Sequence, residues 1–328
     1  MDLPTLEDIQ QARARIAPFV HRTPVQRNQG LSDRFGTNVY LKLELFQKTG
    51  AFKVRGAFNR MLLLSEAERA RGVVATSGGN HAQAVAYAAR MLGIRARILM
   101  PSNTPHNYLE ATRSYGAEVE LTPTIADAFA RAEQYRAEGW VYVHPFDDRW
   151  VMAGQGTLGL ELLEEVPQMT DVFISIGGGG LMTGVATAIK TLRPQVRIWG
   201  VETEGADSMA QALRAGHVVE LPAITSIAKT LGAPAVSERA LEAARRYLES
   251  VTVVRDAEAV EAMRWLLERA KVLTEPAASC TLAALERLRD RFGPGDHVVL
   301  ILCGGNVALD DLCRYAHRFL SLPANAVA

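Results

Sequence analysis

The chain has 328 residues, 48% of them hydrophobic, which is enough apolar surface for two ordinary cores in a soluble globular protein. Its 36 basic and 36 acidic residues balance to a formal net charge of zero, so the charge favours neither a nucleic-acid nor an anionic-membrane partner. The charged N-terminus lacks an apolar core segment and no apolar run is long enough to span a bilayer, so we expect neither export nor membrane insertion.

Short β-rich runs alternate with alanine-rich helical runs after an N-terminal helix-like stretch. The predicted strands of this first series are residues 73–77, 96–100, 118–121 and 141–143. The predicted helices that follow them are residues 82–92, 106–114, 125–137 and 154–164. This alternation is typical of parallel strands joined by crossover helices.

A second series of strands and helices follows. Its predicted strands are residues 172–176, 197–201, 251–254 and 298–302, and its predicted helices are residues 181–192, 238–248, 257–271 and 277–291. Two doubly wound α/β domains are therefore predicted, a large one of residues 1–71 plus 151–328 and a small one of residues 72–150. In this fold class, ligands bind in a crevice beyond the carboxyl ends of the strands.

Lys53 stands directly behind the aromatic Phe52 at the predicted start of a helix. Apolar surroundings disfavour an ammonium group, so its pKa falls and the amine becomes nucleophilic towards an aldehyde. Lys53 is therefore our candidate for a Schiff base with pyridoxal phosphate. The alternative for this residue alone is a solvated helical lysine whose stem covers apolar surface.

Four glycines, Gly177, Gly178, Gly179 and Gly180, follow one predicted strand and precede a helix. Their unhindered backbone can turn tightly and present N–H groups to an anion at the helix N-terminus. The run lacks the Lys-Ser/Thr ending of a nucleoside triphosphate loop. It predicts a phosphate cradle, and the alternative is a flexible turn.

A second turn of the same kind contains Ser77, Gly78, Gly79, Asn80 and His81. Hydroxyl, amide and imidazole groups concentrated at a helix start suit a substrate carboxylate. The alternative is an N-cap with a solvent-facing histidine.

Cys303 ends the last apolar strand, where the crevice is expected. A neutral thiol could face a pyridine nitrogen without forcing its protonation, although most free cysteines are simply small buried hydrophobes. We assign no role to Cys280 or Cys313. Three scattered cysteines do not form a disulfide framework or a zinc site, which favours a reducing, cytoplasmic compartment.

The motifs together resemble the serine/threonine dehydratase family, which are pyridoxal-phosphate enzymes of the tryptophan-synthase β-like fold. The resemblance extends in the family's order from about residue 40 to the end, and it rests on residues 47–57, 77–81, 144–148, 153–157, 177–180 and 303–306. It implies a cofactor bound by the large domain in the interdomain cleft, with the small domain on the substrate side.

The same resemblance implies a role for each motif. Lys53 would be the imine lysine, with Phe52 beside the cofactor ring and Asn80 at its phenolic oxygen. Gly177 to Gly180 would hold the phosphate, and Cys303 would face the ring nitrogen. Residues 77–81 would contact the substrate carboxylate.

Three differences from the family pattern, and one expectation about the region after the last motif, refine this picture. Serine racemases of the group carry a second serine where this chain has Gly78, which argues against racemisation as the main activity. Lys229 replaces an aspartate of many dehydratases and leaves substrate preference open. At the cation site of some relatives Glu202 and Ala206 match but Ser208 replaces an aspartate, so no metal is expected. We also expect no regulatory domain after the last motif, and hence no isoleucine feedback through one.

The resemblance thus implies a dehydratase that converts L-threonine, and L-serine, to a 2-oxo acid and ammonia by β-elimination. The alternatives are an eliminase or racemase of a related amino acid, such as serine or 3-hydroxyaspartate, and a small-molecule binding protein with a vestigial cofactor site. The expected partner is a small amino acid, and the family suggests a homodimer or homotetramer.

Overall fold

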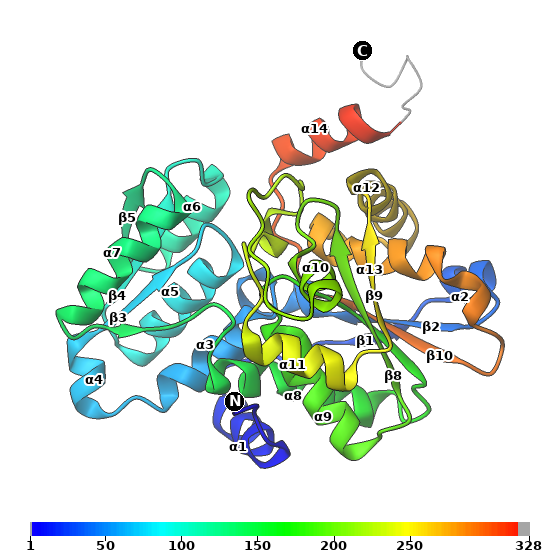
Figure 1. Ribbon diagram of the computed structural model, residues 1–328, viewed down its shortest axis with the longest axis horizontal. Helices are drawn as coiled ribbons and strands as arrows, with labels where there is room; N and C mark the ends of the chain where they lie inside the picture. The colour runs from blue at the N-terminus through cyan, green and yellow to red at the C-terminus, as the bar shows by residue number, and fades with distance from the viewer. Residues whose placement is uncertain (1, 321–328) are drawn as a thin grey trace.

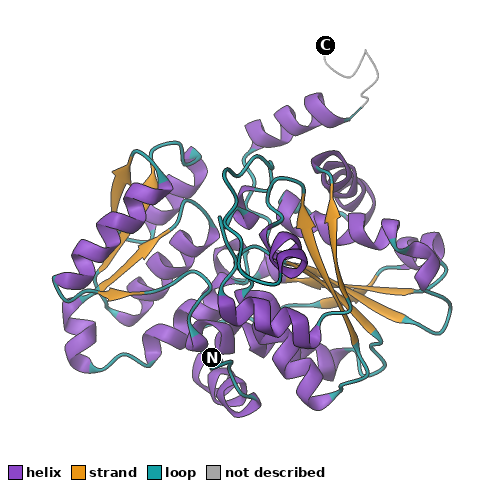
Figure 2. Ribbon diagram, viewed as in Figure 1, coloured by secondary structure: helices purple, strands orange, loops and turns teal. Residues whose placement is uncertain are grey.

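The computed structural model describes residues 2–320, within which the strands form two sheets, each flanked by helices (Figures 1 and 2). The larger sheet has six strands in the order β1-β2-β10-β7-β8-β9. Its neighbours are parallel except for the antiparallel β1–β2 pair at one edge. The strands are β1 (Val25–Arg27), β2 (Asn38–Leu43), β7 (Asp171–Ser175), β8 (Arg197–Thr203), β9 (Ser250–Val254) and β10 (His297–Leu302).

The smaller sheet has four parallel strands in the order β5-β4-β3-β6. They are β3 (Val73–Thr76), β4 (Ala96–Pro101), β5 (Glu118–Thr122) and β6 (Val141–Tyr142). Successive residues of β3 point to opposite faces of this sheet. Val73 and Ala75 belong to the core that includes α5, whereas Val74 packs with Ala128 and Tyr135 of α7. Both faces of the sheet are therefore covered.

Helices connect the strands in both units. Those at the N-terminus and around the small sheet are α1 (Leu6–Ile16), α2 (Gln29–Phe35), α3 (Lys53–Leu62), α4 (Glu66–Arg71), α5 (Asn80–Leu92), α6 (His106–Ser114) and α7 (Ile125–Ala137). The others are α8 (Arg149–Glu165), α9 (Gly180–Leu192), α10 (Ser208–Ala215), α11 (Glu238–Tyr247), α12 (Asp256–Trp265), α13 (Pro276–Arg287) and α14 (Leu309–Phe319). In residues 2–320, no helix combines the length and the apolar character that crossing a bilayer requires.

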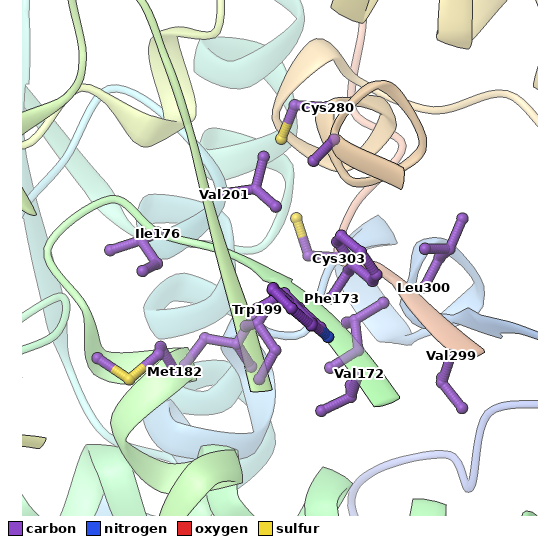
Figure 3. Close-up of a cluster of buried hydrophobic side chains, with 14 of the residues drawn as sticks. Val172, Phe173, Ile176, Met182, Trp199, Val201, Cys280, Val299, Leu300 and Cys303 are labelled. Carbon is purple, nitrogen blue, oxygen red and sulfur yellow. The ribbon is translucent and has the colours of Figure 1, made fainter. Parts of the chain in front are cut away.

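The large sheet contains the larger apolar core (Figure 3). Phe173 of β7 stacks on Trp199 of β8 with their ring centroids 6.0 Å apart. All residues of β10 after His297 are buried, because helices cover both faces of this central strand. Each burial of a large apolar side chain of this kind contributes about 1.5–3 kcal/mol, so the core holds the carboxyl ends of β7 and β10 in fixed positions.

The predicted α/β class with doubly wound parallel sheets is confirmed, and each of the eight predicted strands is present. The predictions omit β1 and β2, and the antiparallel β1 departs from an all-parallel sheet. The predicted helix over residues 257–271 is interrupted, because α12 ends at Trp265 and a π-helical turn, η4 (Leu266–Ala270), follows.

Candidate active site

A pocket lies where β7 and β10 end and where α3, α5, α9 and α13 begin. Its lining combines residues from both sheet units: Phe52, Lys53, Asn80, Phe146, Ser175, Gly177, Gly178, Gly179, Gly180, Leu181, Thr230, Leu231, Glu275, Ala277 and Cys303. The structure therefore brings together Lys53, the four glycines, Asn80 and Cys303. Ser77, Gly78, Gly79 and His81 precede or follow Asn80 in the adjoining turn, outside this lining.

Backbone hydrogen bonds join the segment before Lys53 to the end of β10. Ala51 forms an antiparallel bridge with Gly304, and the Phe52 N–H donates to the Cys303 carbonyl at 3.1 Å. The Gly305 N–H donates in turn to the Gly50 carbonyl at 2.9 Å. These backbone bonds place Lys53 and Cys303 in one pocket although 250 positions separate them in sequence.

The Lys53 amine points into the pocket, where Nζ donates to the Pro145 carbonyl at 2.8 Å and lies 5.1 Å from the centre of the Phe52 ring. Burial lowers the pKa of Lys53 to about 8, although the negative charge of Glu275 opposes that shift. A substantial fraction of the amine is thus neutral near physiological pH. The lowered pKa of Lys53 agrees with the expectation from the sequence.

The four glycines form the turn between β7 and α9. Gly179 adopts φ +91°, a conformation that favours glycine, and a Cβ on Gly178 would lie 2.2 Å from the Phe146 ring. The helix that follows starts at Gly180 and has 13 residues. Its free N–H groups face the pocket end of the turn, so the turn suits a phosphate.

Cys303 is buried beside Ser175 and α13. The Ser175 hydroxyl donates to Sγ at 3.4 Å, and Sγ lies 3.6 Å from the Ala277 carbonyl. Burial, followed by the nearby Glu275 carboxylate, raises the pKa of Cys303 to about 12. Its thiol is therefore neutral at physiological pH.

Glu275 is a site residue that the sequence did not identify. Its carboxylate accepts hydrogen bonds from Asn80 Nδ2 at 2.9 and 3.0 Å and from Thr230 Oγ1 at 2.8 Å. Burial raises its pKa, although the Asn80 and Thr230 donors oppose the shift. The available signal was one acidic residue immediately before Pro276 at the start of an apolar helix.

Asn306 completes a chain of polar contacts across the pocket. Its Nδ2 donates to Asn80 Oδ1 at 2.8 Å and to the Thr49 carbonyl at 2.7 Å. Asn80 thus accepts from Asn306 and donates to Glu275, which fixes the orientation of its amide. The chain links α5 of the small-sheet unit to two segments beside the large sheet.

The His81 imidazole bonds to backbone: Nε2 lies 2.8 Å from the Val143 carbonyl. Burial, helped by the positive charge of Lys53, lowers the pKa of His81 to about 3, so the ring is neutral and donates this bond. His144 is also neutral, because burial lowers its pKa to about 4, and its Nδ1 accepts from Asp147 N at 2.7 Å. Neither ring supplies positive charge.

Glu202 caps a helix in this chain. Its two oxygens accept from the N–H groups of Met209 and Ala210, both at 2.8 Å. Burial raises the pKa of Glu202 to about 8, although the two N–H donors oppose that shift. Over residues 2–320, no three His, Cys, Asp or Glu side chains gather as a metal ion would need.

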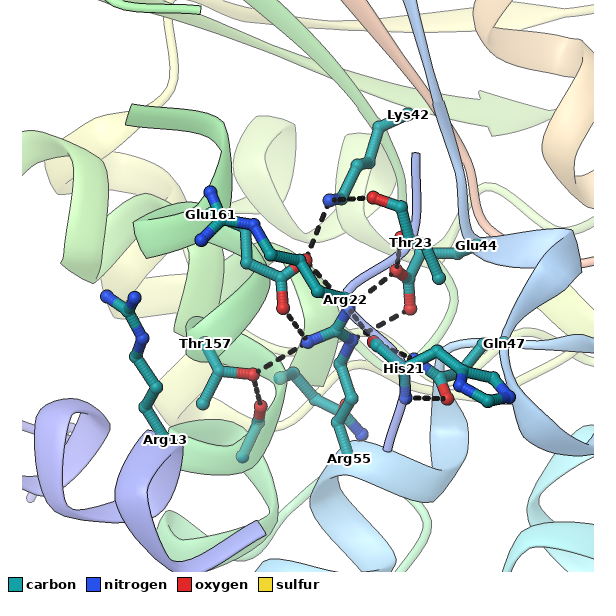
Figure 4. A network of polar contacts seen from close by, with 12 residues as sticks. Arg13, His21, Arg22, Thr23, Lys42, Glu44, Gln47, Arg55, Thr157 and Glu161 are labelled. Atoms are coloured by element: carbon teal, nitrogen blue, oxygen red, sulfur yellow. Dashed lines mark hydrogen bonds and ion pairs between the residues drawn. The ribbon is translucent and has the colours of Figure 1, made fainter. Parts of the chain in front are cut away.

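A buried ion network supports the helix that begins at Lys53 (Figure 4). Arg55 donates to both oxygens of Glu44 at 2.8 Å and to the two oxygens of Glu161 at 2.6 and 3.0 Å. Lys42 Nζ also donates to Glu161, at 2.7 Å. Burial raises the pKa of Glu44, but the Arg55 guanidinium outweighs this effect and the net pKa is lowered.

Comparison with known proteins decides the family. The sequence profile described as pyridoxal-phosphate dependent enzyme matches residues 16–304. The chain belongs to the pyridoxal-phosphate dependent enzyme family. The pocket described above therefore lies in the fold of a pyridoxal-phosphate enzyme.

Relatives within the pyridoxal-phosphate dependent enzyme family are similar over most of their length. The L-threonine ammonia-lyase of Thermotoga maritima is 40% identical over 96% of this chain and 79% of its own. The catabolic L-threonine dehydratase of Staphylococcus aureus N315 is 39% identical over 93% and 90%, respectively.

Two solved structures have the same fold. Maize serine racemase superposes with a TM-score of 0.91 at 36% identity, covering 96% of this chain and 98% of its own. The threonine deaminase from T.th. superposes with a TM-score of 0.88 at 38% identity, covering 93% and 99%. The tryptophan-synthase β-like fold predicted from the sequence is thus confirmed.

The residues present fit the family's cofactor. The glycine turn lines the pocket at the start of α9 and can take the phosphate, and the Lys53 amine of lowered pKa can react with the aldehyde. A neutral thiol, Cys303, lies on the same pocket wall as Ala277.

Proposed function

We propose that this protein is an ammonia-lyase that converts L-threonine, and L-serine, to the corresponding 2-oxo acid and ammonia. One observation carries the proposal: a single pocket holds the Lys53 amine with its lowered pKa, a turn of four glycines at the start of a helix and the neutral thiol of Cys303. The names of the relatives that are about 40% identical support the choice of reaction.

We assign each residue a place around the cofactor. Lys53 would bind it covalently, with Phe52 beside its ring. Gly177, Gly178, Gly179 and Gly180 would hold the phosphate. Asn80 would bind the phenolic oxygen, and Cys303 would face the ring nitrogen. The turn of Ser77, Gly78, Gly79, Asn80 and His81 takes the substrate carboxylate.

The bound cofactor supplies an electron sink for the negative charge that forms at the substrate Cα. The chain supplies the proton transfer and the environment. Once freed, the Lys53 amine accepts the Cα proton, for which its lowered pKa keeps it partly neutral. The β-hydroxyl then takes up a proton, which the Lys53 ammonium can return, and leaves as water. The released enamine takes up water to give the 2-oxo acid and ammonia.

Cys303 favours elimination over side reactions in this proposal. With a pKa near 12, its thiol does not transfer a proton to a ring nitrogen at neutral pH, which limits the stability of negative charge at Cα. Prompt loss of the β-hydroxyl relieves that charge. Racemisation and transamination, which need a longer-lived charge, are disfavoured.

The test is 2-oxo acid release from protein supplied with pyridoxal phosphate, on L-threonine, L-serine and D-serine in parallel. We expect product from the L-amino acids. Lys53→Ala should lose the absorbance band of the bound cofactor and nearly all turnover. The matched control is Lys190→Ala, since Lys190 donates to the Pro194 carbonyl at the end of α9 and should be dispensable. Full activity in Lys53→Ala would reject the assignment.

A racemase is the second candidate, favoured by the similarity to maize serine racemase. Gly78 offers no side-chain proton donor, which speaks for the lyase. Chiral analysis of the same L-serine reaction separates the two activities: D-serine formed faster than 2-oxo acid would favour the racemase.

We further propose that the protein acts in the cytoplasm as a homodimer or homotetramer. The three free cysteines, of which Cys280 and Cys303 are buried, support a reducing compartment. We also propose the domain division at residues 72–150, supported by the four strands of the small sheet, which lie within it.

A further inference from the structure

The hydroxyl of Thr104 is buried without a hydrogen-bond partner. Thr104 follows β4, and its N–H donates to the Pro101 carbonyl at 3.0 Å. Only 8% of the residue is exposed, and among residues 2–320 no group bonds to Oγ1. Buried hydroxyls in folded proteins nearly always have a partner, so this one is available to a ligand.

This hydroxyl lies directly against the turn between β3 and α5. A Cβ built on Gly78 would lie 2.8 Å from Thr104 Oγ1 and 3.5 Å from Pro101 Cδ. Thr104 therefore occupies the space that a side chain at position 78 would need. The next residues of the turn lead into Asn80, which lines the cofactor pocket.

Two of the other three polar side chains of this turn already donate to protein groups. The His81 ring donates to Val143, whereas Ser77 Oγ accepts from Gly79 N at 3.1 Å and keeps its own O–H for a ligand. Asn80 Nδ2 donates to Glu275. A carboxylate bound at the N-terminus of α5, a helix of 13 residues, gains from the helix dipole but needs further donors.

We propose that Thr104 is a substrate-binding residue whose hydroxyl donates a hydrogen bond to the carboxylate of the amino acid at this turn. The proposal rests on the proposed function, which places the substrate carboxylate there. It adds a group from outside the 77–81 motif. The hydroxyl replaces water contacts that the free carboxylate loses on binding, so it increases affinity more than turnover.

The test compares Thr104→Val, which keeps the shape and removes the hydroxyl, with Thr104→Ser, which keeps the hydroxyl. The control is Thr112→Val in α6, because Thr112 is also buried but its hydroxyl bonds to the Tyr108 carbonyl at 2.7 Å, away from the turn. For Thr104→Val we expect KM for L-threonine to rise about tenfold, the size of a lost hydrogen bond to a charged group, with kcat within about twofold.

Binding of L-alanine, which has no β-hydroxyl to eliminate, gives a second readout by calorimetry on the cofactor-loaded protein. Its Kd should rise about tenfold in Thr104→Val and stay near wild type in Thr104→Ser and Thr112→Val. If Thr104→Val does not retain the cofactor band, Thr104→Ala takes its place with the same expectations.

Unchanged KM and Kd in Thr104→Val would overturn the proposal, as would equal losses in Thr104→Val and Thr104→Ser. Failure of the proposed function has a different signature, namely wild-type protein that carries the cofactor band but forms no 2-oxo acid from either L-amino acid. L-alanine binding still tests Thr104 in that case, because it does not depend on elimination.

Discussion

At the scale of single residues, the site depends on side chains whose ordinary ionisation is shifted by burial. Lys53 becomes less basic and Cys303 less acidic because each loses water in the same pocket. Glu275 holds the Asn80 amide and places negative charge near Lys53. It therefore affects both the geometry and the basicity of the site.

Removing the charge of Glu275 should lower the pKa of Lys53 below about 8, because that charge raises it in the wild type. Only the neutral amine reacts with the cofactor aldehyde, so the rate of pyridoxal-phosphate uptake by cofactor-free protein should rise with pH through this pKa. We expect the midpoint of this rise to move to lower pH in Glu275→Gln.

Stopped-flow absorbance at several pH values measures this midpoint. The control is Glu110→Gln, an exposed carboxylate on α6. A midpoint that stays in place in Glu275→Gln, or that moves equally in the control, would contradict the assigned charge effect. Turnover of Glu275→Gln should also fall about tenfold, since the amide NH2 that replaces Oε2 would face the Asn80 Nδ2 donor from which this oxygen accepts.

At the scale of elements, the start of α3 is held by ions rather than by apolar packing alone. Arg55, two residues after Lys53, is fully buried between Glu44 of η1 (Glu44–Phe46) and Glu161 of α8. The pairs fix α3 against α8. The direction of Lys53 into the pocket follows from that placement.

Arg55→Met should destabilise the protein by about 3–5 kcal/mol, because it leaves the Glu44 and Glu161 carboxylates buried without their partner. Arg264→Met on α12 should change stability by less than about 1 kcal/mol, since its pairs with Glu261 and Glu268 are exposed. Urea unfolding followed by circular dichroism measures both. Similar losses in the two variants would refute the special role of the buried network.

The same network explains where sequence-based prediction of elements failed. Residues 38–43 form the largely buried strand β2, yet Lys42 interrupts their apolar pattern, and its charge is compensated by Glu161 and Glu165, far along the chain. Local periodicity identified the strands of the two series because most of them are rich in apolar residues and alternate with helical runs. Distant ion pairs carry no local signal.

The candidate site shows the same contrast between residues marked by local motifs and residues that matter through distant contacts. Lys53, the four glycines, Asn80 and Cys303 stood out because they lie in short motifs at strand or helix ends, and they meet in one pocket. Glu275 and Thr104 lie outside those motifs. Their importance depends on contacts with Asn80 and Gly78 that form only when the two sheet units pack together or when loops of one sheet meet.

At the scale of the whole molecule, several buried groups make stability depend on pH in opposite directions. His81 and His144 have lowered pKa values, so the unfolded chain binds more protons than the folded one below pH 6.5, and stability rises with pH there. The contribution of Glu202 to stability changes with pH in the opposite direction. Its folded pKa of about 8 exceeds the ordinary value of 4.5, so its contribution is lost as pH rises towards 8.

Between pH 6.5 and 8 the histidine effects have ended and Glu202 should make the protein less stable, by about 1–2 kcal/mol over the interval. Glu202→Gln cannot ionise and should flatten this fall, even if the loss of one N–H contact at α10 lowers stability at every pH. Melting temperatures of the cofactor-loaded protein, taken every half unit of pH, give the slope for each protein. An equally steep slope in Glu202→Gln would show that Glu202 does not take up the proton, whereas a flatter one assigns the uptake to this buried carboxylate.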